Sequence, residues 1–355
     1  PGCVGLDVGE THGVLVDTGG RARSWGRSGF GALGHGSDDE IIAVPRIIES
    51  LAMERIICVA SGNDFSMMLT AEGALFSVGK NNLGQLGLGH RNDVNGAPRQ
   101  VPIDGVVRTV CAGHGHAAAI TGEGSLFTWG WGNHGQLGHD DRSLRDRPTA
   151  VASTALVAKQ LAAGYSCTLV IDADDAVWIT GRLRLGGGPS STTFSHVQFP
   201  DTPGLPPLRF VQVSITHVHA LALTTDGGLF SWGYGGGGRL GNGSRKDNDV
   251  PQLVQTLKDV PIASAKAGFF TSLALARSGE MWSWGRGLAL GHGGDDDSQQ
   301  LLPKVIEGLP PGASILRIAA GGDKAACVRA DGTAVCWGKF GHEGQLGTST
   351  PTILG

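Results

Sequence analysis

Residues 113–138, GHGHAAAITGEGSLFTWGWGNHGQLG, hold a pattern that recurs seven times along the chain. Each copy closes an apolar stretch with a glycine, and these glycines are Gly26, Gly79, Gly130, Gly181, Gly233, Gly285 and Gly338. Their successive gaps are 53, 51, 51, 52, 52 and 53 residues. A second landmark stands seventeen positions upstream of each, at Gly9, Gly62, Gly113, Gly164, Thr216, Gly268 and Gly321. A fixed period of about 50 residues predicts a modular ring or array, because one unit alone cannot bury its apolar face.

Each unit is predicted to be an antiparallel sheet. After the first landmark comes a run that is apolar on both faces, such as residues 118–120, which indicates a strand buried between neighbours. A turn dipeptide such as Glu123-Gly124 follows and predicts a tight hairpin. The returning strand carries bulky side chains at alternate positions, as in Phe127 and Trp129. These sheets are expected to stack face to face.

Seven such sheets with aromatic wedges predict an all-β fold, a single closed seven-bladed β-propeller domain over residues 1–355 with four antiparallel strands in each blade. The chain begins inside a unit, at the strand that leads to Gly9, and its tail, residues 351–354, matches residues 45–48. We therefore expect N- and C-terminal strands to close the ring, with the tail supplying what the first unit lacks and leaving no exposed end blade.

Composition narrows the class of partner and the compartment. The net charge is −4 and no basic stripe is visible, so the sequence carries no strong nucleic-acid footprint. No apolar run reaches membrane-spanning length, which predicts no membrane partner. Six cysteines without Cys-x-x-Cys spacing indicate buried thiols in a reducing compartment. We expect an intracellular protein, cytoplasmic or nuclear.

Few residues invite a chemical role. His114-x-His116 and His217-x-His219 have the spacing of ligands on one side of a strand, but no carboxylate or thiol completes a metal site. The alternative is a structural hydrogen bond from His116 and His219. The acidic run 295–297 fits a solvated loop better than a cation site. No catalytic constellation or phosphate loop is found, so we expect no cofactor, no metal and no enzyme activity.

One face of the ring is the better candidate for function. Hairpin geometry brings both landmarks of every unit to one face and all the turn dipeptides to the other. The residue after each closing glycine is a cation or an aromatic in all seven units. The candidate partner-binding residues are Asp64, His116, Trp131, His219, Tyr234, Arg286 and Asp323. Exposed Trp, Tyr and Arg are typical of interaction hot spots. The alternative is that these long side chains pack their stems along neighbouring loops.

The repeated motifs resemble those of a known family. The order Ala-Gly-x-x-His, apolar run, Asp-Gly, Trp-Gly and Gly-Gln-Leu-Gly is similar to the regulator-of-chromosome-condensation (RCC) repeat of seven-bladed propellers. The last element is intact at residues 84–87, 135–138 and 344–347. The resemblance covers the whole chain. It implies the fold more specifically than the function, because one fold can carry many different functional sites.

Members of the family include an exchange factor for the small GTPase Ran, interaction domains of large ubiquitin ligases and a plant UV-B photoreceptor. By resemblance, Asp64 matches an acidic residue that contacts the GTPase in the exchange factor, while His116 and His219 match a recurrent histidine. The exchange factor's β-wedge insertion and the photoreceptor's Gly-Trp-Arg-His-Thr motifs have no counterpart here. We therefore expect a protein–protein interaction scaffold; the alternative is a guanine nucleotide exchange factor for a Ran-like small GTPase.

Overall fold

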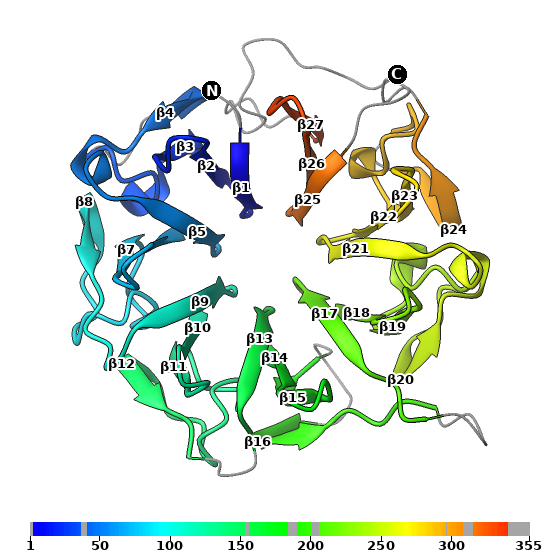
Figure 1. Ribbon diagram of the computed structural model, residues 1–355, viewed down its shortest axis with the longest axis horizontal. Helices are drawn as coiled ribbons and strands as arrows, with labels where there is room; N and C mark the ends of the chain where they lie inside the picture. The colour runs from blue at the N-terminus through cyan, green and yellow to red at the C-terminus, as the bar shows by residue number, and fades with distance from the viewer. Residues whose placement is uncertain are drawn as a thin grey trace.

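In the computed structural model, seven antiparallel sheets radiate from a central channel, as Figure 1 shows. The structure describes residues 3–36, 41–152, 156–183, 190–200, 206–295, 297–307 and 315–339. Within these ranges six sheets have four strands and one has three, and each sheet uses consecutive strands from the channel outward. The seven-bladed all-β propeller with four-stranded antiparallel blades is thereby confirmed.

The strands of the first four blades are β1 (Cys3–Val8), β2 (His12–Asp17), β3 (Ala22–Arg27) and β4 (Ile41–Ile47); β5 (Ile56–Ser61), β6 (Phe65–Thr70), β7 (Leu75–Gly79) and β8 (Val94–Gln100); β9 (Val107–Ala112), β10 (His116–Thr121), β11 (Leu126–Gly130) and β12 (Arg145–Ala150); and β13 (Ala158–Ala163), β14 (Cys167–Asp172), β15 (Val177–Arg182) and β16 (Ser190–His196).

The strands of the last three blades are β17 (Phe210–Ile215), β18 (His219–Thr224), β19 (Leu229–Gly233) and β20 (Asn248–Leu253); β21 (Ile262–Ala267), β22 (Thr271–Ala276), β23 (Met281–Arg286) and β24 (Gln299–Val305); and β25 (Ile315–Gly321), β26 (Lys324–Arg329) and β27 (Ala334–Gly338). Short 3₁₀ turns lie in the connections at η1 (Gly29–Gly31), η2 (Glu49–Leu51), η3 (Gly236–Gly238), η4 (Gln255–Leu257) and η5 (Leu288–Leu290). No helix in the described part of the chain has the length and apolar character needed to cross a bilayer.

The ring closes where β1 lies beside β25 (Figure 1). The first blade takes all four of its strands from residues 3–47, so the expectation that the tail supplies a strand which the first unit lacks needs correction. The first strand of each blade lies innermost and ends at the channel, and the fourth lies outermost (Figure 1). In the first blade β1 supplies the innermost strand and β4 the outermost one. Residues 351–354 lie outside the described ranges, and a single domain over residues 1–355 stays a prediction.

The glycine that closes each repeat is required by two constraints at once. In all seven copies its φ lies between 86° and 125°, a left-handed conformation that glycine adopts without a steric penalty. A Cβ at each of these positions would also lie 2.2–2.6 Å from the carbonyl oxygen of the turn between the first two strands. This close approach fixes the end of the third strand against that turn.

The core lies between neighbouring sheets. Tryptophans on the third strands, such as Trp129 and Trp284, connect their blade to the preceding one. The indole Nε1 donates to a backbone carbonyl in the loop of the blade before, from Trp129 to Gln85 at 3.0 Å and from Trp284 to Arg239 at 2.9 Å. Both indoles are fully buried. In the fourth blade Thr180 takes the place of tryptophan, and its hydroxyl donates to the carbonyl of Gly135 at 2.8 Å.

Candidate functional site

The predicted face carries two concentric rows of side chains, and we call it the loop face. Its inner row consists of the turns between the first and second strands of each blade, and its outer row of the residues that follow the closing glycines. A backbone hydrogen bond joins the rows in all seven blades, as from Lys80 to Asp64 at 2.9 Å and from Trp131 to Gly115 at 2.8 Å. The placement of both landmarks on one face therefore agrees with the structure.

His116 and His219, both proposed as partner-binding residues, are fully buried. Each is the first residue of a second strand, and its Nε2 pairs with a hydroxyl of the next blade, Thr168 at 3.0 Å and Ser272 at 2.8 Å. Burial lowers the pKa of His116 to about 3, so its ring is neutral. The two histidines join neighbouring blades and cannot contact a partner directly, which corrects the expectation and supports the structural alternative.

Six side chains of the loop face form a chain of ring contacts, which we call the aromatic arc; they are His114, Trp131, Tyr165, His217, Phe269 and Phe270. The Tyr165 ring lies 4.3 Å from His114 and 5.6 Å from Trp131. His217 bridges the rings of Tyr165 and Phe269, at centroid distances of 4.6 and 4.2 Å. The arc thus runs over four consecutive blades along one side of the channel mouth.

All six rings of the arc are half-buried, and its two histidines are held neutral. Burial lowers the pKa of His217 to about 4, and His114 and Arg239 add to the shift. Burial also lowers the pKa of His114, although Asp64 partly opposes this. A neutral aromatic surface loses little hydration free energy when a partner covers it, so the arc is suited to an apolar contact.

Carboxylates occupy the other side of the channel mouth. Asp64 forms an ion pair with Lys80 at 3.2 Å, and Asp323 lies at the same turn position in the seventh blade. Desolvation raises the pKa of Glu10, and the nearby Asp64 carboxylate acts in the same direction. Asp323 adds to this effect, whereas Lys324 opposes it. The loop face is therefore divided into an aromatic half and a charged half.

Tyr234 and Arg286 lie in the outer row. Tyr234 is 43% exposed, and the Arg239 guanidinium lies 4.9 Å from its ring centroid. Arg286 forms an ion pair with the exposed Asp297. Both side chains are therefore accessible, while their partners hold them close to the surface. Trp131 is less exposed than expected, because the rings of His134 and Tyr165 lie against it.

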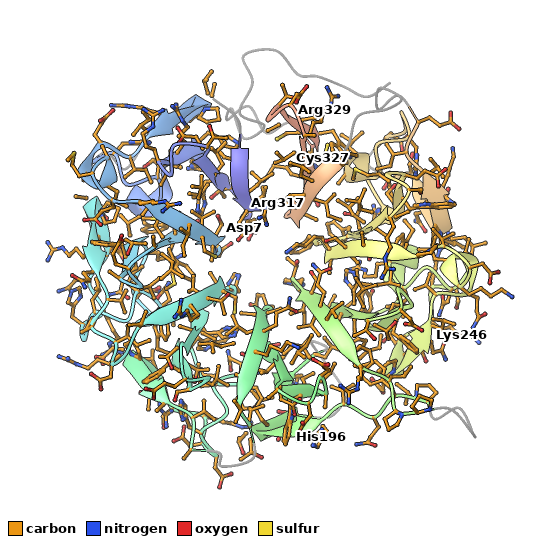
Figure 2. All side chains as sticks on the ribbon, viewed as in Figure 1. Asp7, His196, Lys246, Arg317, Cys327 and Arg329 are labelled. Atoms are coloured by element: carbon orange, nitrogen blue, oxygen red, sulfur yellow. The ribbon has the colours of Figure 1, made fainter. Side chains whose placement is uncertain are left out.

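The channel under the loop face contains a cavity of about 440 Å³. Its polar side chains bind the backbone of the next blade: Asp7 accepts from the Ser61 amide at 2.7 Å, and Gln160 accepts from the Val213 amide at 2.9 Å. Figure 2 places Asp7 and Arg317 beside the channel. In the described residues no group of three or more His, Cys, Asp or Glu side chains could hold a metal ion. The channel walls thus serve to join the blades.

Sequence reasoning placed Asp64, Trp131, Tyr234, Arg286 and Asp323 on this face but missed most of the aromatic arc. The missed residues follow the first landmark directly, at His114, Tyr165, His217 and Phe269. The signal was available, because this position holds four rings in consecutive repeats. His114 and His217 were considered only as metal ligands, and the partner-binding candidates were taken one or two residues later in each repeat.

Comparisons with known proteins agree with the geometry. Residues 2–271 match the family model described as RCC1-like domain. The E3 ubiquitin-protein ligase HERC2 of Mus musculus is 33% identical over 343 residues, which are 93% of this chain and 7% of that protein. The ultraviolet-B receptor UVR8 of Arabidopsis thaliana is 31% identical over 309 residues, 86% of this chain and 70% of the receptor.

Solved structures support the same fold. The crystal structure of Prp20p from Saccharomyces cerevisiae, described with its binding properties to Gsp1p and histones, is similar with a TM-score of 0.77. The match covers 96% of this chain and 83% of that one at 22% sequence identity, and at this identity it shows the fold alone. The chain spans only a small part of HERC2, so nothing follows here about the activity of a larger protein.

Proposed function

Because the chain belongs to the family of proteins with an RCC1-like domain, we propose that it is a non-catalytic module that binds a protein partner through its loop face. The aromatic arc is the observation that carries this proposal. Six rings in continuous contact over four blades make an apolar surface beside a charged one, which is the composition of an interaction hot spot and its polar rim.

The arc is also rigid before any partner arrives. Trp131 is held by the rings of His134, at 4.9 Å, and of Tyr165, while the backbone at both positions is fixed by the turn hydrogen bonds. Fixed side chains lose little conformational entropy on association, so more of the contact energy is retained as affinity. The partner proposed for this surface presents an apolar segment to the arc and basic groups to Glu10 and Asp64.

Truncating the arc is expected to weaken partner capture strongly. In the double variant Trp131→Ala/Tyr165→Ala, the loss of two rings of the arc should weaken binding by about 2 kcal/mol or more, roughly thirtyfold. The measurement is quantitative mass spectrometry of proteins captured by the wild type and by the variant. The control Val250→Ala/Leu302→Ala removes apolar side chains that are 55% and 45% exposed and lie on outer strands. Equal capture by both variants would show that the face is wrong.

A second candidate function is nucleotide exchange on a Ran-like small GTPase, and the place of Asp64 favours it. Its carboxylate is on the loop face beside the channel mouth, held by Lys80, where the family resemblance implies a GTPase contact. Exchange requires contacts that stabilise the nucleotide-free GTPase more than the loaded one. The test is release of fluorescent GDP from Ran at micromolar concentrations of the protein. Acceleration that Asp64→Ala removes would establish exchange; absence of acceleration would leave the binding module.

A further inference from the structure

The side chains that join neighbouring blades along the channel wall follow a rule with two exceptions. Four and two residues before the landmark that opens each repeat, the innermost strand turns a side chain toward the next blade. Where this side chain is an acceptor, it binds an amide of the next innermost strand. The four pairs are Gln160 with Val213 at 2.9 Å, Gln212 with Ala265 at 2.9 Å, Asp7 with Ser61 at 2.7 Å and Ser214 with Ala267 at 3.0 Å.

The two exceptions are cations in neighbouring blades. Lys266 lies two residues before the landmark of the sixth blade, and Arg317 lies four residues before that of the seventh. Both line the channel cavity, and Figure 2 labels Arg317 at its edge. Ammonium and guanidinium groups donate hydrogen bonds and cannot accept them. Two amides of the next strands therefore face a cation instead of an acceptor, that of Ala320 beside Lys266 and that of Leu6 beside Arg317.

The strand register indicates that these two amides point into the channel. Leu6 pairs with the residue six places after its landmark, as does Val213, whose amide binds a channel side chain. Ala320 pairs with the residue four places after its landmark, as does Ala267. Within the described ranges, no side chain and no carbonyl of another blade accepts from the amide of Leu6 or Ala320. Two cations and two main-chain donors thus lie together on the side of the channel formed by β21, β25 and β1 (Figure 1).

Two glutamines extend this surface of donors. The Oε1 atoms of Gln160 and Gln212 each accept an amide of the next blade, so the group that each has left is Nε2, which only donates. Both side chains line the same cavity as Lys266 and Arg317. Four consecutive blades, from the fourth to the seventh, therefore present side-chain donors to the channel.

The acidic side chains of the cavity do not use these donors. Among the described residues that line it, only Asp7 and Glu10 carry carboxylates. Asp7 already accepts from the Ser61 amide; burial raises its pKa, and Lys266 opposes this shift. Glu10 follows the landmark at the loop-face mouth. In the part of the chain that the structure describes, neither Lys266 nor Arg317 forms an ion pair or donates a hydrogen bond. The chemistry of a ligand is therefore selected by donors that lack acceptors, and not by net charge alone.

We propose that this side of the channel binds a small ligand with two oxyanion groups, carboxylate or phosphate. One oxyanion accepts from Arg317 and the Leu6 amide, and the other accepts from Lys266 and the Ala320 amide. These two amides stand two residues apart in the register of the innermost strands, a separation of about 7 Å along the channel. The cavity of about 440 Å³ falls within the size range of small-molecule sites.

Isothermal titration calorimetry at constant ionic strength tests the proposal with three anionic probes, namely citrate, pyrophosphate and fructose 1,6-bisphosphate. Fructose is the neutral control. We expect at least one anion to bind with one-to-one stoichiometry, and the preferred probe distinguishes carboxylate from phosphate as the bound group. Lys266→Met and Arg317→Met keep a long side chain and remove its charge. Each should weaken binding of that probe at least about tenfold, because hydrogen bonds to charged groups are strong.

Arg317→Gln separates loss of the ligand from loss of the fold. It introduces into the seventh blade the residue that accepts the next amide in the fourth and fifth blades, so the Leu6 amide gains an acceptor. We expect this variant without ligand to unfold at or above the wild-type temperature. It should nevertheless bind the probe at least about tenfold more weakly than the wild type.

The matched control is Arg245→Met/Lys246→Met, which removes two exposed cations away from the channel; Lys246 lies at the outer edge of the molecule in Figure 2. It should bind the probe with wild-type affinity. Three results would overturn the proposal: none of the three anions binds, fructose binds as tightly as they do, or Lys266→Met/Arg317→Met retains wild-type affinity. Each of these results concerns the channel and leaves partner capture by the loop face to its own test.

Discussion

Replacing Trp284 by alanine is expected to lower the free energy of unfolding by about 3–5 kcal/mol. The indole is fully buried, and it packs among residues of the fifth and sixth blades such as Leu223 and Ala274. Its Nε1 also donates to the carbonyl of Arg239, 45 residues earlier in the chain. Truncation therefore leaves both a cavity between two blades and an unpaired carbonyl. The measurement is chemical unfolding at equilibrium.

Trp284→Phe is the control, because it keeps most of the ring volume and removes the hydrogen bond. We expect it to cost about 1–3 kcal/mol, the penalty for leaving a buried acceptor without its donor. If the alanine variant loses less than the phenylalanine variant, the indole does not act as a wedge between these two blades.

Replacing Gly321 by alanine is expected to cost about 3 kcal/mol or more, because a Cβ there would lie 1.7 Å from the carbonyl oxygen of Val8. Gly321 ends β25 and Val8 ends β1, so the clash falls where the last blade meets the first. The backbone of Gly321 does not have a positive φ, and the cost therefore measures the close approach alone. Thermal and chemical unfolding measure the loss.

Gly279→Ala is the matched control for this variant. Gly279 has a φ of +94° and nothing lies within 4 Å of a Cβ built on it, so the substitution costs only the left-handed backbone, about 1–2 kcal/mol. A smaller loss for Gly321→Ala than for Gly279→Ala would contradict the closure of the ring between β1 and β25.

The sequence predicted the fold well because the residues that the fold requires recur at fixed positions in each repeat. Glycines 17 residues apart mark the two places where a backbone carbonyl comes too close for a side chain: a neighbouring blade's at Gly113 and the same blade's turn at Gly130. The fifth repeat has Thr216 in place of the first landmark glycine, which the sequence shows. The sequence does not show what the threonine side chain binds. In the structure its hydroxyl donates to the carbonyl of Ala267 in the next blade.

The candidate site was predicted only in part, for a physical reason. The third position after the landmark opens a strand, so its side chain turns toward the next blade, as His116 does. The first position is at the outer end of the turn, where Tyr165 meets His114 and His217. A shift of two residues separates the interior from the surface, and the repeat pattern alone does not fix the residue at which the strand begins.

The side-chain contacts on the loop face could not be read from the sequence, although the four rings at one position of consecutive repeats could. Contacts such as that between Trp131 and Tyr165 join residues from two blades, and their ring distances depend on how the blades are spaced around the channel. The same holds for the pairing of Arg286 with Asp297, which brings a loop back onto the strand end. Repeat periodicity predicts which rows exist and leaves open which side chains touch.

The central claim is that a protein partner covers the aromatic arc, and hydrogen–deuterium exchange of the captured complex tests it most directly. Slowed exchange is predicted at the loop-face turns, residues 113–116, 164–167, 215–219 and 268–271. The turns between the second and third strands, residues 71–74, 122–125 and 225–228, should exchange as in the free protein. Protection confined to this second set, with the loop-face turns unchanged, would contradict the account.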